Sequence, residues 1–192
     1  MEIEIVNPRI YVCSLLVTML FARPAMAADW RMDPGGSRLE FSASYQGEPA
    51  PGRFKQFDTR MNFDPARLGK SELIVTVKLS SVDMGSAEID EAVRAPEWLN
   101  LSKFTRAEFR STDIKRAATD RYVARGTLNL KGRQRPLDVP FSWKPDGKAA
   151  TMMGEVTLDR TAFGIGTGEW ATGDPIGVGV KISFNVRLQP AS

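Results

Sequence analysis

The residues best suited to chemistry in this 192-residue chain are four carboxylates close together in the sequence. Asp83, Glu88, Asp90 and Glu91 could form a general acid–base pair or supply oxygen ligands to a cation. Their spacing fits no metal-binding loop, and acidic residues are also favoured in the first turn of a helix, where they interact well with its dipole. We therefore interpret the segment as the solvated start of a short helix over 87–93. A hydrolase that uses Asp83 or Asp90 is an alternative.

The chain lacks the residues on which most catalytic and metal sites depend. It has no histidine, and its one cysteine is Cys13. Zinc and copper sites with nitrogen or sulfur ligands are therefore excluded, as are Ser-His-Asp and Cys-His catalytic arrangements. The glycine-rich stretch 164–168 superficially resembles a phosphate-binding loop, but it lacks the spacing and opens no predicted helix. We expect no catalytic residues, no metal and no cofactor.

Lys131, Arg133 and Arg135 form a basic cluster around a predicted hairpin tip. They could hold a phosphate or an anionic lipid head group, and the alternative is an ordinary solvated turn. Elsewhere the charges are well mixed, with 26 Lys and Arg against 23 Asp and Glu and a net charge of +3. The chain has no basic block or stripe of the kind that binds nucleic acid, so we expect no nucleic-acid partner.

The N-terminus has the pattern of a secretory signal. Residues 10–22 form an apolar run after Arg9, and the following Ala25-Met26-Ala27 fits a cleavage site with small residues at both ends. The run is shorter than the roughly 20 apolar residues needed to span a bilayer. We predict a cleaved signal peptide over 1–27 and one exported, periplasmic domain over 28–192. Because Cys13 lies in the signal, the mature domain has no thiol and no disulfide.

The elements that must position these groups are β-strands. From Val178 to Leu188 apolar and polar residues alternate, which places them on opposite faces of a strand. Including weaker copies of this pattern, the predicted strands are 37–45, 53–63, 72–80, 106–114, 120–130, 135–144, 149–158 and 177–188. In the second of them, Phe54 and Phe57 are out of phase, which predicts a bulge or a strong twist.

Eight antiparallel strands linked mostly by hairpins favour an all-β, up-and-down barrel over a sandwich. The short helix lies in the long connection between the third and fourth strands. A barrel of this size has room for its own side chains or for one small ligand. The aromatic residues that could fill a core or line a slot for a long apolar ligand are Phe41, Tyr45, Phe57, Phe63, Phe109, Phe141, Trp143, Phe163 and Trp170. Strand periodicity cannot separate a filled interior from a hollow one.

Short motifs occur in a definite order along the mature chain. They are Trp30-x-x-Asp33-Pro34-x-x-Ser37-x-x-x-Phe41, Gly52-x-Phe54-x-x-Phe57, Ser80-Ser81-Val82-Asp83-x-Gly85, Asp90, Trp98-Leu99-Asn100, Lys103-Phe104, Phe109-x-Ser111-Thr112, Gly126-x-Leu128-x-Leu130-x-Gly132-x-x-Arg135-Pro136-Leu137 and Leu158-Asp159-Arg160-x-x-Phe163-Gly164-Ile165-Gly166. Each motif alone is weak, but the ordered set is specific. It resembles the YceI-like polyisoprenoid-binding proteins of bacterial periplasms.

The resemblance implies an extended, lipocalin-like barrel with an elongated cavity for an isoprenoid chain, such as that of a quinone or a prenyl pyrophosphate. It also implies an exported protein without catalytic residues, and Asp159 and Arg160 as an ion pair or a cap. In this interpretation inward strand residues enclose the lipid tail, and Arg133 and Arg135 at one mouth meet the head group.

The chain departs from the family pattern at two positions. Gly36 and Tyr45 stand where many members carry histidines, so any head-group contact made by those histidines does not transfer. Residues 164–170 (GIGTGEW) look like a subgroup version of their loop, found in proteins associated with membrane-bound dihaem cytochromes. This suggests a membrane-bound cytochrome or another inner-membrane protein as a partner. The alternative to a lipid carrier is a fully packed barrel that binds such a partner through its loops, and the oligomeric state is left open.

Overall fold

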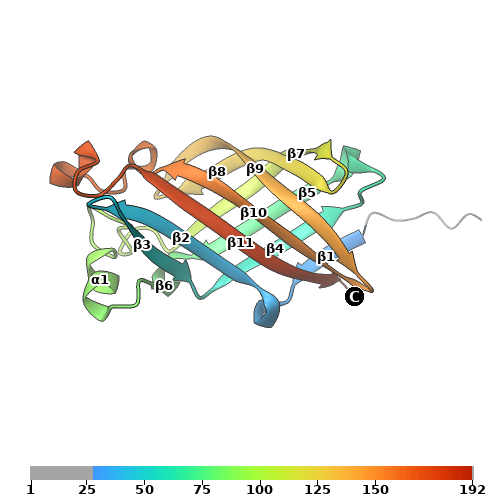
Figure 1. Cartoon of the computed structure of the whole chain (residues 1–192), viewed down its shortest axis with the longest axis horizontal. Coiled ribbons are helices and arrows are strands. Elements are labelled where there is room, and N and C mark those ends of the chain that lie inside the picture. The colour runs from blue at the N-terminus through green and yellow to red at the C-terminus, as the bar shows by residue number, and fades with distance from the viewer. Residues whose placement is uncertain (1–27, 192) are drawn as a thin grey trace, which may run out of the picture.

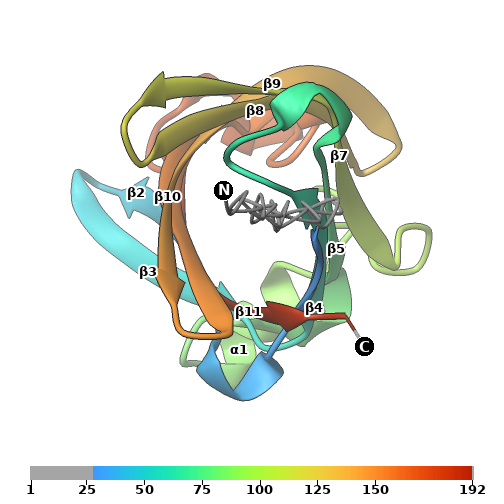
Figure 2. The same ribbon diagram turned by 90° about the vertical axis from the view of Figure 1, so that its right-hand side faces the viewer.

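Eight strands hydrogen-bond in a closed antiparallel ring in the computed structural model, which describes residues 28–191 (Figures 1 and 2). The ring consists of β1 (Ala28–Met32), β4 (Phe57–Phe63), β5 (Glu72–Lys78), β7 (Arg106–Ala118), β8 (Arg121–Leu130), β9 (Arg133–Asp146), β10 (Ala149–Asp159) and β11 (Gly179–Pro190). It closes where Trp30 pairs with Pro190 and Met32 with Leu188. The predicted eight-stranded barrel is thus confirmed, with β1 as a strand that the alternation did not reveal.

Two of the barrel's strands are interrupted. Strand β11 pairs with β1 near its C-terminal end and with β2 (Arg38–Tyr45) through Lys181–Asn185, so β1 and β2 are two halves of one strand. Strand β3 (Glu48–Phe54) pairs with β2, and β4 pairs with β1, so β3 and β4 are the halves of the next strand. The break between β3 and β4 falls at 55–56, which confirms the distortion predicted between Phe54 and Phe57.

The break between β1 and β2 is a short 3-10 turn over Pro34–Gly36. Pro34 has no N–H for the sheet, and the Asp33 carboxylate accepts a hydrogen bond from the Gly35 N–H at 3.1 Å. At Gly36 an added Cβ would lie 2.9 Å from Cβ of Arg187 on β11. A side chain at this position therefore requires β11 to shift.

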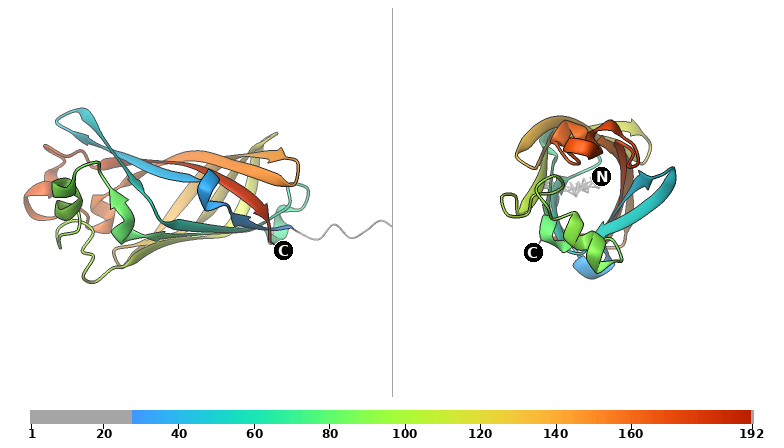
Figure 3. Two further views of the ribbon diagram at one scale, coloured as in Figure 1. Left: turned by 90° about the horizontal axis from the view of Figure 1, so that it is seen from below. Right: turned by 90° about the vertical axis from the view of Figure 1, so that its left-hand side faces the viewer.

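Most of the irregular segments gather at one end of the barrel (Figures 1 and 3). Helix α1 (Ala87–Ala92) follows β6 (Val82–Asp83), which pairs with β3, and the predicted helix is confirmed there. The tip of the β2–β3 hairpin and the 3-10 turns Thr161–Phe163 and Gly168–Thr172 lie at the same end.

Aromatic side chains fill the opposite end, where β1 joins the ring. The Phe63 ring centroid lies 5.0 Å from that of Tyr122 and 4.8 Å from that of Trp143. Trp30 packs edge-on against Trp143 at 5.1 Å, and its indole N–H donates to the Phe63 carbonyl at 3.1 Å. Phe141 completes this group, which closes the barrel interior at this end.

Candidate functional site: an apolar cavity inside the barrel

The middle of the barrel holds an apolar cavity of about 860 Å³. This is within the roughly 300–1,000 Å³ range of sites that enclose small organic molecules. Its wall comes from the inward faces of β2 to β11, together with α1, the segment that follows it and the loop after β10. Almost all of the lining side chains are aliphatic or aromatic, so the cavity suits a hydrocarbon chain.

The alternation read from the sequence explains this wall. In β11, Val180, Ile182, Phe184 and Val186 all line the cavity, and the residues between them face outward. Close packing between β2 and β3 also shapes the cavity wall. Phe41 lies opposite Gly52 in the β2–β3 pair, where an added Cβ would collide with the Phe41 ring and come within 2.6 Å of the Met84 sulfur. Gly52 therefore leaves the space that the Phe41 ring occupies.

The cavity reaches the surface at the end that carries α1. Tyr45 from the β2–β3 tip and Ile89 from α1 line the cavity yet are 49% and 46% exposed, which marks them as its rim. Trp170 and Ile176, from the loop after β10, also line the cavity at this end. Ile176 forms an isolated β-bridge with Tyr45. Ligand entry at this rim meets apolar surface first.

The rim is also acidic. Its three segments, 44–50, 84–93 and 167–179, contain no lysine or arginine. Their carboxylates are Glu48, Glu88, Asp90, Glu91, Glu169 and Asp174. Because like charges repel, this rim disfavours an anionic group.

A buried guanidinium organises the loop beside the rim. Arg160 is 3% exposed and lines the cavity. Its five N–H groups donate to the carbonyls of Ile165, Gly166, Trp170, Ile176 and Gly177, at 2.6–3.2 Å. Its Cζ also lies 5.7 Å from the Trp98 ring centroid. Burial lowers the pKa of Arg160, and the nearby Asp159 carboxylate opposes this shift.

Asp159 acts as a cap rather than as a partner of Arg160. Its Oδ1 accepts hydrogen bonds from the N–H and the hydroxyl of Thr161, at 2.8 and 2.6 Å. These bonds lower the pKa of Asp159. Among residues 28–191, Asp159 forms no ion pair within 4.0 Å. Of the two roles that the family resemblance implied, the cap is the one observed.

The structure separates the aromatic residues singled out from the sequence into two groups. The group on the cavity wall consists of Phe41, Tyr45, Phe57, Phe109, Phe163 and Trp170. Phe63, Phe141 and Trp143 do not line the cavity, which corrects the expectation for these three. They point inward as predicted, but they lie beyond the end of the cavity, where they pack on one another.

Several lining residues were not singled out from the sequence. Phe54 is out of phase with Phe57 in its predicted strand, and Trp98 lies in the long connection before the fourth predicted strand, so no alternation marked either as a lining residue. Phe184 lies in the clear alternation of β11 and could have been included on that signal. Arg160 carried no sign that it would be buried, because its partners are backbone carbonyls.

The basic hairpin tip lies outside the apolar cavity. Arg133 lines a smaller outer pocket together with Lys103 and Lys131. Arg135 is exposed, and its guanidinium donates to the Gln134 carbonyl at 3.2 Å. Neither arginine lies on the rim of the cavity. The expectation that both meet a head group at the cavity mouth was therefore wrong about where they lie. The cause is that the hairpin tip is tied by Lys131 to the segment that follows α1 and to the loop after β10, while its two arginines point to the outside of the barrel and stay exposed.

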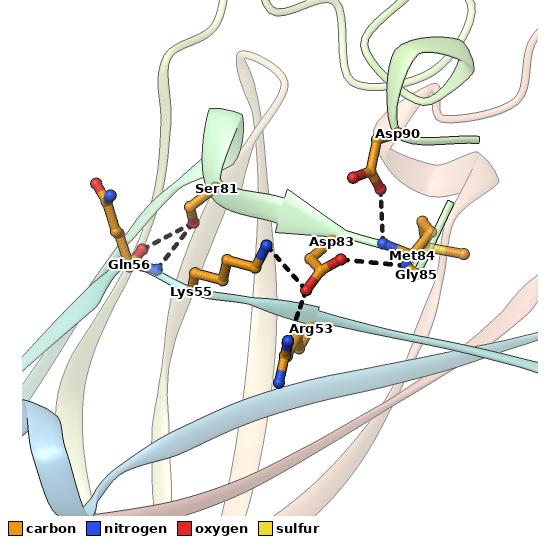
Figure 4. Close-up of polar contacts among 8 residues, drawn as sticks. All are labelled: Arg53, Lys55, Gln56, Ser81, Asp83, Met84, Gly85 and Asp90. Carbon is orange, nitrogen blue, oxygen red and sulfur yellow. Dashed lines mark hydrogen bonds and ion pairs between the residues drawn. The ribbon is translucent and has the colours of Figure 1, made fainter. Parts of the chain in front are cut away.

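Asp83 and Asp90 have structural partners (Figure 4). Asp83 pairs with Arg53 at 2.8 Å and Lys55 at 3.0 Å, and it accepts from the Gly85 N–H at 3.1 Å. Hydrogen bonds from Lys55, Arg53 and Gly85 lower the pKa of Asp83 to about 2. Asp90 accepts from the Met84 N–H at 2.6 Å, which joins α1 to the end of β6. A carboxylate with so low a pKa is a weak base, which does not favour Asp83 as the general base of the hydrolase alternative.

Within residues 28–191, no three His, Cys, Asp or Glu side chains come close enough together to hold a metal ion. In the same part of the chain, no helix has both the length and the apolar character needed to cross a membrane. The predicted signal peptide, 1–27, lies outside the described residues.

Comparison with known proteins agrees with this geometry. Residues 30–188 match the sequence model of the YceI-like domain. A UPF0312 protein of Azotobacter vinelandii is 34% identical over 133 residues, which are 68% of this chain and 69% of that protein. The crystal structure of BcnA from Burkholderia cenocepacia superposes with a TM-score of 0.79 at 28% identity, covering 81% of this chain and 98% of BcnA. A polyisoprenoid-binding domain from Saccharophagus degradans shares the fold, with a TM-score of 0.67 at 13% identity over 86% of this chain and 99% of that domain.

Proposed function

This chain belongs to the YceI-like family, and from that premise we propose that it is a periplasmic binding protein for an isoprenoid lipid. The observation that carries the proposal is the apolar cavity of about 860 Å³, which opens to the surface at an apolar rim. A structural neighbour from Saccharophagus degradans is a polyisoprenoid-binding domain, which supports the same ligand class. The protein sequesters or carries its lipid and does not transform it.

Hydrophobic enclosure supplies the driving force for binding. Each buried methylene contributes about 0.8 kcal/mol. Association costs on the order of 4–15 kcal/mol in lost translational and rotational freedom. A tail of roughly 20 buried carbons therefore offsets even the upper end of that cost. Quinones and prenyl pyrophosphates both carry tails of this kind.

The fully packed interaction module requires an interior filled by side chains. The cavity volume argues against that alternative, because only the end that holds Phe63, Phe141 and Trp143 is filled. Docking to an inner-membrane partner is compatible with a lipid carrier, and the exposed apolar rim is the surface that such a partner would meet.

Substitutions on the two faces of β11 test the proposal. Ile182 lines the cavity and pairs with Val156 on β10 and with Phe41 on β2. Asn185 is on the same strand and is exposed. In Ile182→Asp a carboxylate faces the cavity, where it is costly to desolvate, so geranylgeraniol binding measured by tryptophan fluorescence should be lost. The matched control Asn185→Asp should bind like the wild type.

Circular dichroism of each variant shows whether the barrel is folded. A folded Ile182→Asp protein that binds geranylgeraniol as tightly as the wild type would mean that the tail is held elsewhere.

A further inference from the structure

A second pocket lies on the outside of the barrel at the β8–β9 hairpin tip. Its volume is about 310 Å³. It lies between the tip, the segment that follows α1 and the first residues after the 3-10 turn Thr161–Phe163. The residues around it are Pro96, Asn100, Lys103, Phe104, Lys131, Arg133, Phe163, Gly164 and Thr167. Basic and aromatic side chains therefore meet in one small concave site.

The positive charge in this pocket is not neutralised by ion pairs. Among residues 28–191, Lys103, Lys131 and Arg133 have no carboxylate within 4.0 Å. Burial and the charge of Arg133 lower the pKa of Lys131, and the charge of Glu97 opposes them. Bringing an anion into the pocket would relieve this repulsion.

The pocket is held in shape by hydrogen bonds that leave donors available. The Lys131 ammonium donates to the carbonyls of Pro96 at 2.8 Å and Gly164 at 2.6 Å, so it ties the two bordering loops together. An ammonium group has three N–H donors, so one remains. Arg133 makes only a long contact of 3.4 Å, to the Ala162 carbonyl. Its fork of N–H groups suits the oxygens of a phosphate.

The outer pocket and the apolar cavity share one wall. Phe163 is the one described residue that lines both. The two openings differ in charge, because the cavity rim carries carboxylates without lysine or arginine, whereas the outer pocket carries three cations. A negatively charged group is repelled from the first and attracted to the second.

We propose that the outer pocket formed by Lys103, Lys131, Arg133 and Phe163 is a binding site for a phosphate or pyrophosphate group. The group belongs either to a free anion or to the head of an amphiphile that the protein binds. Only the second source rests on the proposed lipid-binding function.

Titration calorimetry with inorganic pyrophosphate at low salt tests the pocket by itself. The double variant Lys103→Gln, Arg133→Gln should bind about tenfold more weakly or worse, because two charged donors are lost. The control Arg135→Gln changes an exposed arginine of the same hairpin and should bind like the wild type. Lys131 is left intact because it holds the loops together.

No pyrophosphate binding by the wild-type protein would overturn the proposal. An equal loss of affinity in Arg135→Gln would also overturn it, because binding would then reflect net charge alone.

Two lipids with the same tail distinguish the sources of the phosphate. If the pocket takes the lipid head, geranylgeranyl pyrophosphate binds more tightly than geranylgeraniol, and the double variant removes this preference. If the source is the free anion, the two lipids bind alike while inorganic pyrophosphate still binds. Geranylgeraniol binding reports on the cavity alone, and binding of inorganic pyrophosphate reports on the outer pocket alone. The lipid-binding proposal can therefore hold when the phosphate site is refuted, and the phosphate site can hold when the lipid-binding proposal is refuted.

Discussion

Replacing Arg160 with methionine tests how the loop beside the cavity mouth is held. All five N–H groups of Arg160 donate to carbonyls between Ile165 and Gly177, and the side chain is 3% exposed. Methionine is flexible enough to occupy much of the same space, but it has no donor. The substitution therefore leaves these carbonyls without their partner.

The expected cost follows from those carbonyls. Each buried acceptor left without a donor costs about 1–3 kcal/mol. Water can reach some of the five, because Gly168 and Glu169 in the same loop are exposed. We therefore expect a loss of about 3 kcal/mol in the free energy of unfolding, at the upper end of ordinary single substitutions.

Urea unfolding and amide hydrogen exchange measure this effect. The unfolding midpoint should fall, and exchange should quicken in residues 163–177 while the strands stay protected. Arg135→Met is the control and should change stability by no more than about 0.5 kcal/mol. An Arg160→Met protein with wild-type stability and unchanged exchange in this loop would refute the reasoning.

Three further predictions concern the frame around the cavity. Phe63→Ala should lower the free energy of unfolding by about 4 kcal/mol in urea titrations, because it leaves a void among packed rings; a change below about 1 kcal/mol would count against the packed end. Gly36→Ala should cost about 1–3 kcal/mol by the same measurement, because its Cβ would crowd Cβ of Arg187, and wild-type stability would contradict this. Asp83→Asn should be less stable than the wild type at pH 7. The pKa of Asp83 is lowered from 3.8 to about 2, so its contribution to the free energy of unfolding is present above pH 3.8 and disappears as the pH falls through 2. The unfolding curves of the two proteins should therefore converge near pH 2. A difference in stability that stays constant with pH would show that Asp83 is not the titrating group.

The fold could be predicted from the sequence because strand alternation is a local signal. The period of β11 places Val180 to Val186 on the cavity face, and the out-of-phase Phe54 and Phe57 mark the break between β3 and β4. Strand β1 was missed because its five residues are too few to show a period.

The extent of the cavity could not be predicted in the same way. Phe109 and Phe141 both face inward, but the first lies on the cavity wall and the second lies in the packed end. The difference depends on how rings from β1, β4, β8 and β9 meet, which is a property of three-dimensional packing. The roles of Arg160 and Lys131 were hidden for a similar reason, because both bind backbone carbonyls, Arg160 in the loop that follows it and Lys131 in two segments far away in the sequence.

Native mass spectrometry of the protein isolated from its own cells tests the central claim most directly. The account predicts one lipid adduct per chain, with an extracted mass that fits an isoprenoid, and loss of the adduct in a folded Ile182→Asp variant but not in Asn185→Asp. A chain mass without adduct, unchanged after incubation with quinones and prenyl phosphates, would contradict it.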